Sequence, residues 1–179
     1  MARYGAVDVH YPARGGAAAA LVVADDPAFG HVVEERTAVL TDVAPYRPGA
    51  LYLRELPAVL AVLATTAPVD LLVVDGYVTL DPEGTPGLGA RAHVELGVPV
   101  VGVAKTAYRS ATHAVPVLRG AASRPLLVTA AGMSGAAAAD LVRAMAGPYR
   151  LPTALQRVDR LCREAGGGAD PVTDVAPGC

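Results

Sequence analysis

Four carboxylates are the first candidates for chemistry in this sequence. They are Asp8 inside a strand-like segment, Glu55 before an apolar helical segment, Asp75 at the end of "LLVVD", and Asp159 within the last helical segment. Strand interiors are depleted in Asp, so Asp8 in particular calls for an explanation. Neighbouring central strands could bring Asp8 and Asp75 side by side, and crowded carboxylates repel each other unless a divalent cation neutralises them.

Such a cluster would suit one kind of cation and one kind of reaction. Mg²⁺ takes oxygen ligands and usually binds through one or two carboxylates together with substrate phosphates. Two such ions roughly 4 Å apart can activate water and stabilise the leaving oxygen of a phosphodiester. Lys105, at the end of "VPVVGVAK", could help to hold the phosphate. These residue types therefore indicate metal-assisted phosphodiester hydrolysis.

Each of these residues also has an ordinary structural interpretation. Asp75 before Gly76 is a common turn pair, and Glu55 at a helix start would interact favourably with the helix dipole. Lys105 could be a solvated loop residue. The functional interpretation therefore depends on whether the fold brings the residues together.

The elements that must position these residues fall into two halves. Three short apolar runs separated by turn signals predict an antiparallel meander over residues 3–11, 17–24 and 31–40. Beyond them the pattern alternates between helices and buried strands. We expect helices within 56–66, 85–97, 134–147 (with Ser134 as N-cap) and 151–165, strands at 69–76 and 98–105, and a weaker hairpin over 113–120 and 124–130. This order predicts an α/β fold with a mixed sheet flanked by helices.

Composition limits the remaining possibilities. With 179 residues, 53% of them hydrophobic, the chain predicts one domain over residues 1–165 followed by a flexible tail over 166–179. The net charge of −2 argues mildly against tight non-specific binding to nucleic acid. The sequence has no apolar run of the roughly 18 residues that span a membrane, no sign of a signal peptide, and no glycine-rich phosphate loop. We therefore expect a cytoplasmic protein without an organic cofactor.

The order of motifs resembles the endonuclease V family, also called deoxyinosine 3′ endonucleases. The resemblance runs from about Gly5 to Arg163 through "VDVHY", "PYRPGALYLRELP", "LLVVDG", "LGVPVVGVAK" and "YRLPTALQRVDRL". It implies an RNase H-like fold with a mixed five-stranded sheet, in which parallel strands follow three antiparallel ones. It also implies a monomeric, Mg²⁺-dependent enzyme, with Mn²⁺ as an alternative ion. Such an enzyme nicks DNA, or RNA in some members, on the 3′ side of a deaminated base.

The resemblance also assigns roles to individual residues. Asp8, Glu55 and Asp75 correspond to the metal-binding carboxylates, Asp159 to a late acidic residue near the metals, and Lys105 to a lysine near the scissile phosphate. The "PYRP" segment, with Pro45, Tyr46 and Arg47, matches the wedge that helps to turn the damaged base out of the duplex. Turning a base out costs a few kcal/mol, least where the base is damaged or mismatched. Leu51 and Gly76 are expected beside the base pocket.

The sequence departs from the family pattern after Asp75. The family usually continues as Asp-Gly-His/Gln-Gly and then His-Pro with basic residues, whereas this chain reads "DGYVTLDPEGTPG". Val78 replaces a glycine expected beside the base pocket, Asp81 replaces a histidine, and Glu83 and Gly84 replace the basic pair. Two alternatives therefore stay open. One is a divergent homologue that acts on a different phosphate or nucleoside substrate, and the other is a non-catalytic nucleic-acid-binding homologue.

Overall fold

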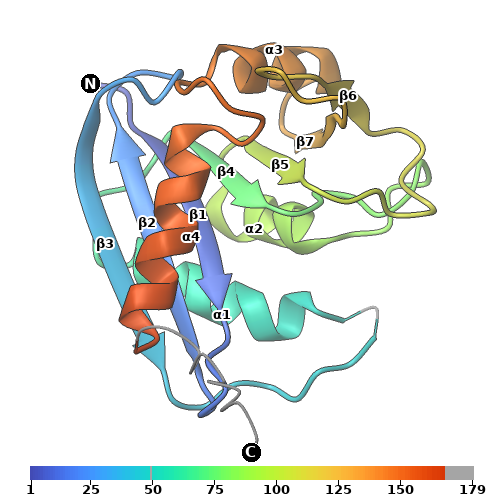
Figure 1. Cartoon of the computed structure of the whole chain (residues 1–179). Helices are drawn as coiled ribbons and strands as arrows, with labels where there is room; N and C mark the ends of the chain where they lie inside the picture. The colour runs from blue at the N-terminus through green and yellow to red at the C-terminus, as the bar shows by residue number, and fades with distance from the viewer. Residues whose placement is uncertain (49, 168–179) are drawn as a thin grey trace, which may run out of the picture.

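A seven-stranded mixed sheet forms the centre of the molecule (Figure 1), as described for residues 1–48 and 50–167 of a computed structural model. The strand order is β3-β2-β1-β4-β5-β7-β6. The strands are β1 (Tyr4–His10), β2 (Ala17–Ala24), β3 (Val32–Leu40), β4 (Leu71–Asp75), β5 (Val100–Ala104), β6 (Val115–Val117) and β7 (Leu126–Ala131). The first three are antiparallel, and β4 and β5 continue the sheet in parallel with β1. This confirms the predicted mixed α/β fold.

The sheet has two strands more than the five that were expected. The weaker hairpin candidate forms, and β7 pairs with β5 in antiparallel orientation while β6 pairs with β7. The predicted helices are present as α1 (Tyr52–Leu63), α2 (Leu88–Leu96), α3 (Gly135–Ala144) and α4 (Thr153–Ala165). The Ser134 hydroxyl accepts a hydrogen bond from the Ala137 amide at 3.1 Å, which confirms Ser134 as the N-cap of α3. Most of the expected C-terminal tail, from residue 168, lies outside the described residues.

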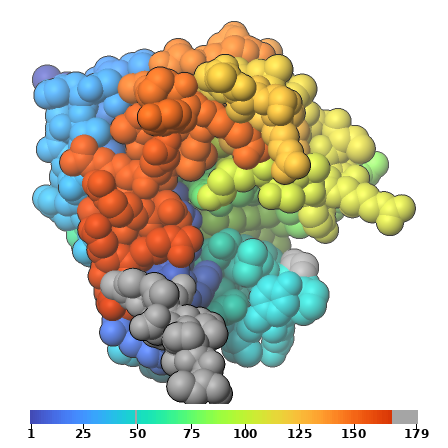
Figure 2. Space-filling model, in the orientation of Figure 1, coloured from blue at the N-terminus to red at the C-terminus, as the bar shows by residue number. Residues whose placement is uncertain are grey.

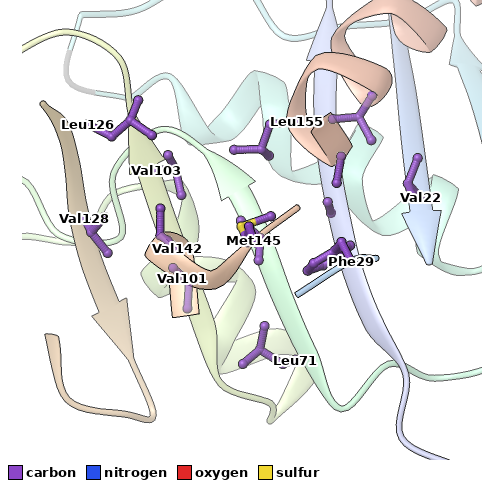
Figure 3. Packing of buried hydrophobic residues seen from close by; sticks show 14 of the residues in the cluster. Val22, Phe29, Leu71, Val101, Val103, Leu126, Val128, Val142, Met145 and Leu155 are labelled. Carbon is purple, nitrogen blue, oxygen red and sulfur yellow. The ribbon is translucent and has the colours of Figure 1, made fainter. Parts of the chain in front are cut away.

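Helices cover both faces of the sheet, which explains why the central strands are apolar throughout. In β4 alternate residues serve different cores: Leu71 and Val73 pack with α3 and α4, whereas Leu72 and Val74 pack with α1 and α2. Figure 3 shows the first of these cores, with Leu71 among its labelled side chains. Packing on both faces fixes β4, a central strand, and places Asp75 at its C-terminal end. Among the described residues no helix is both long and apolar enough to cross a membrane.

Helix α1 begins earlier than the sequence indicated. We expected its first turn around Pro57, but the helix starts at Tyr52 and Pro57 lies inside it. Proline lacks the amide hydrogen that would bond to the carbonyl four residues earlier. In α1 this removes one hydrogen bond, near the start of the helix. Glu55 therefore lies in the first turn of α1 rather than before it. Because residues three apart share a helix face, Tyr52 and Glu55 project from the same side.

Candidate active site

Parallel pairing of β1 with β4 brings Asp8 and Asp75 side by side. The register aligns Val7 with Val74, and the next residue on each strand is an aspartate. Side chains of neighbouring parallel strands at the same register point to the same face of the sheet. Asp8 and Asp75 are therefore neighbours, as the sequence predicted.

Glu55 faces this pair from α1 and shares the pocket wall with Asp75, and the three carboxylates influence one another's ionisation. Burial, followed by the charge of Asp75, raises the pKa of Asp8 to about 7. Burial, followed by the charges of Asp8 and Asp75, raises the pKa of Glu55 to about 7. Like charges in a partly buried site disfavour ionisation. The predicted trio is thus assembled from three separate elements.

This arrangement fits a hard divalent cation. Carboxylates that are costly to ionise next to one another become stable as anions when a cation lies between them, and Mg²⁺ and Ca²⁺ prefer such oxygen ligands. Asp8, Glu55 and Asp75 would be the residues that hold the ion. The observation behind this fit is the donor set itself, because β1, α1 and β4 each supply one carboxylate and Asp159 adds another beside Asp8.

A second group of donors adjoins the trio. Among the described residues, Asp8, Asp159 and Cys162 have ligand atoms that all lie within 4.8 Å of one another. The Cys162 thiol donates to the backbone carbonyl of Asp159 at 3.2 Å, and Arg163 Nε donates to Asp159 Oδ1 at 3.1 Å. Asp159 therefore lies beside Asp8 as expected. The sequence analysis missed Cys162, although its spacing of three residues from Asp159 puts both on one face of α4.

Lys105 lies at the site, with its charge directed at a carboxylate. Its Nζ donates to Asp75 Oδ2 at 2.5 Å, while 42% of the lysine side chain remains exposed. Arg150, which the sequence analysis did not single out, fixes this end of β5. Its Nη2 donates to the Lys105 carbonyl at 2.6 Å and to the Pro125 carbonyl at 2.9 Å. Lys105 is thus held beside the Asp75 carboxylate and can still reach solvent.

A pocket of about 310 Å³ opens next to the carboxylates, and Glu55 and Asp75 form part of its wall. The predicted residues Tyr46, Leu51 and Gly76 also line it. Gly76 has a φ of +131°, a conformation that side chains strain, so the wall is bare backbone at this point. Figure 2 shows a recess on this face between α4, the loops after β4 and β5, and the first turn of α1.

Two predicted substrate residues lie beside the pocket rather than in its wall. Pro45 and Arg47 flank Tyr46 in the loop before α1, and both are exposed to solvent. The Arg47 carbonyl accepts a hydrogen bond from the Ala50 amide at 3.0 Å, closing a turn. The "PYRP" segment therefore lies at the mouth of the pocket, where Tyr46 is 63% exposed.

Comparison with known proteins identifies the family. The sequence profile named Endonuclease V matches residues 1–136, about three quarters of the chain. The chain belongs to the endonuclease V family. The Endonuclease V of Streptomyces coelicolor is 36% identical over 183 residues, an alignment that covers 89% of this chain and 77% of that protein. Family members are endonucleases that hydrolyse phosphodiester bonds in DNA, so the non-catalytic alternative loses its support.

Solved structures give the same result. The crystal structure of Endonuclease V from Streptomyces avermitilis is similar with a TM-score of 0.77 and 34% identity, covering 92% of this chain and 81% of that one. A Ciona intestinalis Endonuclease V (D234N) in complex with a 23mer DNA containing an inosine has a TM-score of 0.77 at 19% identity, covering 92% and 85%. The endonuclease V neighbours share the RNase H-like fold that the resemblance implied.

One expected departure from the endonuclease V pattern has a different consequence from the one predicted. Val78 was expected beside the base pocket, in place of a glycine, but it is fully buried under α2 and does not line the pocket. Its side chain packs so closely on Gly89 that a Cβ there would lie 2.6 Å from Val78 Cγ2. The Val78 amide also donates to Thr129 Oγ1 at 2.8 Å. Val78 therefore belongs to the core and takes no volume from the pocket beside Glu55 and Asp75.

The other departure leaves negative charge beside the pocket. Asp81 Oδ1 accepts the Thr85 amide at 2.9 Å, and hydrogen bonds to Thr85 hold the pKa of Asp81 below its usual range. Asp81 thus stabilises its own turn, and Glu83 within that turn is exposed. The endonuclease V pattern has basic residues here, so this loop repels phosphate where the family pattern attracts it.

Proposed function

We propose that this chain is a Mg²⁺-dependent endonuclease that nicks DNA on the 3′ side of deaminated bases, deoxyinosine above all. The observation that carries the proposal is the register of β1 and β4, which sets Asp8 beside Asp75 at the edge of an open pocket. Mg²⁺ is the ion we propose, with Mn²⁺ as an alternative, and a cytoplasmic monomer is the expected form. The DNA bound to the Ciona relative contains an inosine, which supports the choice of substrate.

The proposed roles follow from the geometry. Asp8, Glu55 and Asp75 would hold the metal, with Asp159 beside Asp8. The bound metal would activate water and stabilise charge on the phosphodiester oxygens. Lys105 orients the Asp75 carboxylate through its hydrogen bond, and its exposed portion can contact a phosphate. The Lys105 ammonium would turn from Asp75 toward the phosphate if a bound cation shared the charge of that carboxylate.

The pocket would receive the base. Leu51 and Gly76 offer an apolar, close-fitting wall, and Tyr46 at the mouth would fill the gap left in the duplex. A pocket can read a base only after it leaves the stack, and a deaminated base, being poorly paired, leaves most cheaply. Selectivity for deaminated bases would therefore come from the low cost of turning them out of the duplex, together with their fit in the pocket.

A second candidate function has one observation in its favour. The acidic turn that contains Asp81 and Glu83 borders the loop that leads from β4 to the pocket. Negative charge there would weaken contacts with a long polyanion more than contacts with a small ligand. A smaller phosphate-containing or nucleoside substrate is therefore the alternative.

A nicking assay distinguishes the two. Single- and double-stranded DNA and RNA, each with one inosine, are incubated with Mg²⁺ or Mn²⁺ and the wild type or Asp75→Asn. We expect wild-type cleavage one phosphodiester beyond the lesion on its 3′ side, and none from the variant. Hydrolysis of the phosphodiester of an inosine dinucleotide, offered in the same buffers, with no cleavage of any longer strand would favour the alternative. Equal cleavage by wild type and Asp75→Asn would show that a contaminating nuclease was responsible.

A further inference from the structure

Tyrosine side chains gather around the pocket beside the carboxylates. The chain has seven Tyr and one Phe, and four of these tyrosines line this one pocket, namely Tyr46, Tyr52, Tyr77 and Tyr108. The largest fully buried side chains of the molecule are all Leu or Val, so packing of the core does not account for the concentration. Aromatic surface has instead been placed where a ligand would lie.

The four tyrosines differ in how much of the ring is available. Tyr52 is covered by Arg91, whose guanidinium carbon lies 4.5 Å from the ring centroid. Tyr77 is half-buried and engaged through its hydroxyl. Tyr46 and Tyr108 remain 63% and 49% exposed. They come from different segments: Figure 1 shows the loop into α1 below, and the loops that follow β4 and β5 above.

Tyr77 fixes the loop that carries Tyr108. Its hydroxyl donates to the Thr106 carbonyl at 2.8 Å and accepts the Tyr108 amide at 2.9 Å, so one side chain holds the backbone on both sides of Ala107. The Tyr77 and Tyr108 rings also touch, with centroids 6.1 Å apart and planes inclined by 52°. Both hydrogen bonds use the backbone of the loop, and neither depends on the Tyr108 side chain.

We infer that Tyr108 supplies a stacking face for the base that enters this pocket, and that Tyr77 positions it. The inference rests on the proposed function. Every nucleobase offers a π-face, and aromatic side chains commonly hold bases that have left the stack. Tyr108 shares the pocket wall with Asp75, the carboxylate that Lys105 contacts, so the stacking face and the expected phosphate contact belong to one site. Stacking would also supply affinity that the acidic turn with Glu83 cannot supply.

The experiment measures binding rather than cleavage. A short fluorescent duplex with one inosine opposite thymine is compared, by anisotropy, with the same duplex carrying an abasic site, with Ca²⁺ replacing Mg²⁺ and integrity checked on a gel. We expect Tyr108→Ala to weaken binding of the inosine duplex by roughly 5- to 100-fold and to leave the abasic duplex unchanged. Tyr108→Phe, which keeps the ring, should bind like the wild type. Tyr149→Ala is the matched control, since Tyr149 is 66% exposed and lies outside the pocket.

Tyr77→Phe tests the positioning role, because it removes both hydrogen bonds and keeps both rings. We expect a smaller loss of inosine binding than for Tyr108→Ala, and no loss at all would overturn the role of Tyr77. Equal weakening of both duplexes by Tyr108→Ala, or no weakening, would overturn the stacking role. If the wild type prefers the inosine duplex but does not cleave it with Mg²⁺, the proposed function is wrong, while the stacking role of Tyr108 still stands. Thermal melting of each variant separates these outcomes from misfolding.

Discussion

The Lys105 ammonium lies 2.5 Å from the Asp75 carboxylate, at the point where β4 and β5 end side by side. Burial opposes the charge of Lys105, but the hydrogen bond to Asp75 prevails and raises the lysine pKa above its ordinary value. A metal that binds Asp75 must therefore compete with this ammonium. In the proposed function, this pairing would connect metal binding and phosphate binding through one side chain.

Replacing Lys105 should separate these functions. Lys105→Met removes the competing charge, so we expect Mn²⁺ to bind more tightly in calorimetric titrations without DNA. The gain should be about two- to fivefold, because a partly exposed ion pair contributes little free energy. The same variant loses a charged contact to phosphate, and kcat for nicking should fall by about 10- to 100-fold. Arg143→Met, which breaks an exposed ion pair with Asp140 on α3, is the control and should change neither quantity. Weaker Mn²⁺ binding by Lys105→Met would show that the lysine does not compete with the metal.

The carboxylate trio predicts how stability depends on pH when EDTA removes divalent ions. The pKa values of Asp8 and Glu55 are about 7 in the folded chain, raised from 3.8 and 4.5. Between roughly pH 4 and 7 the folded state therefore binds more protons than the unfolded state, and stability falls as pH rises. Each group contributes about 2.6 kcal/mol of this loss between pH 5 and pH 8, so we expect a total of about 5 kcal/mol, measured by urea unfolding in EDTA.

Two comparisons test the origin of this pH dependence. Asp8→Asn removes one of the titrating groups, so its free energy of unfolding should vary less with pH than that of the wild type. Mg²⁺ binds the ionised carboxylates, so it should stabilise the wild type more at pH 8 than at pH 5. A wild type that gains stability with pH in EDTA would contradict the elevated pKa values.

Sequence reasoning predicted the site where strand periodicity determined the geometry. Asp8 and Asp75 each follow an apolar strand segment, and parallel pairing of the two strands was enough to bring them together. It failed where the backbone direction changed. Gly76 adopts a positive φ, and two residues later the chain has turned Val78 inward toward α2, which a linear comparison with the family motif could not reveal.

Two other misses have physical causes of their own. The helix was expected within residues 56–66, but it begins at Tyr52. Pro57 removes only one hydrogen bond near the start of the helix, so the helix tolerates it. Cys162 was not predicted as a site residue, whereas helix α4 turns it to the buried side beside Asp8. A contact between distant segments decides the case of Cys162, and local patterns carry little information about such contacts.

Arg119 should be essential for stability although no carboxylate partners it among the described hydrogen bonds. It is 7% exposed, and its guanidinium donates to the backbone carbonyls of Met145, Gly147 and Tyr149, at 3.1 Å and 2.9 Å for the last two. Arg119→Met would leave these carbonyls without a donor in a partly buried place. We expect the free energy of unfolding to fall by about 2–4 kcal/mol, measured with urea. Arg160→Met, at an exposed position of α4, should cost less than about 0.5 kcal/mol, and equal losses would deny Arg119 this role.

Charge reversal in the acidic turn tests whether this endonuclease V binds DNA less firmly than the family pattern would allow. Glu83 is exposed, whereas Asp81 holds the turn through Thr85, so Glu83 is the position to change. Glu83→Arg should tighten DNA binding several-fold at low salt and steepen the dependence of log K on log salt concentration by about 0.9, as one new phosphate contact would. Glu95→Arg on α2, away from the pocket with the carboxylates, makes the same charge change and should leave the salt slope within error of the wild type. If both variants steepened the slope equally, net charge rather than the position of Glu83 would explain the effect.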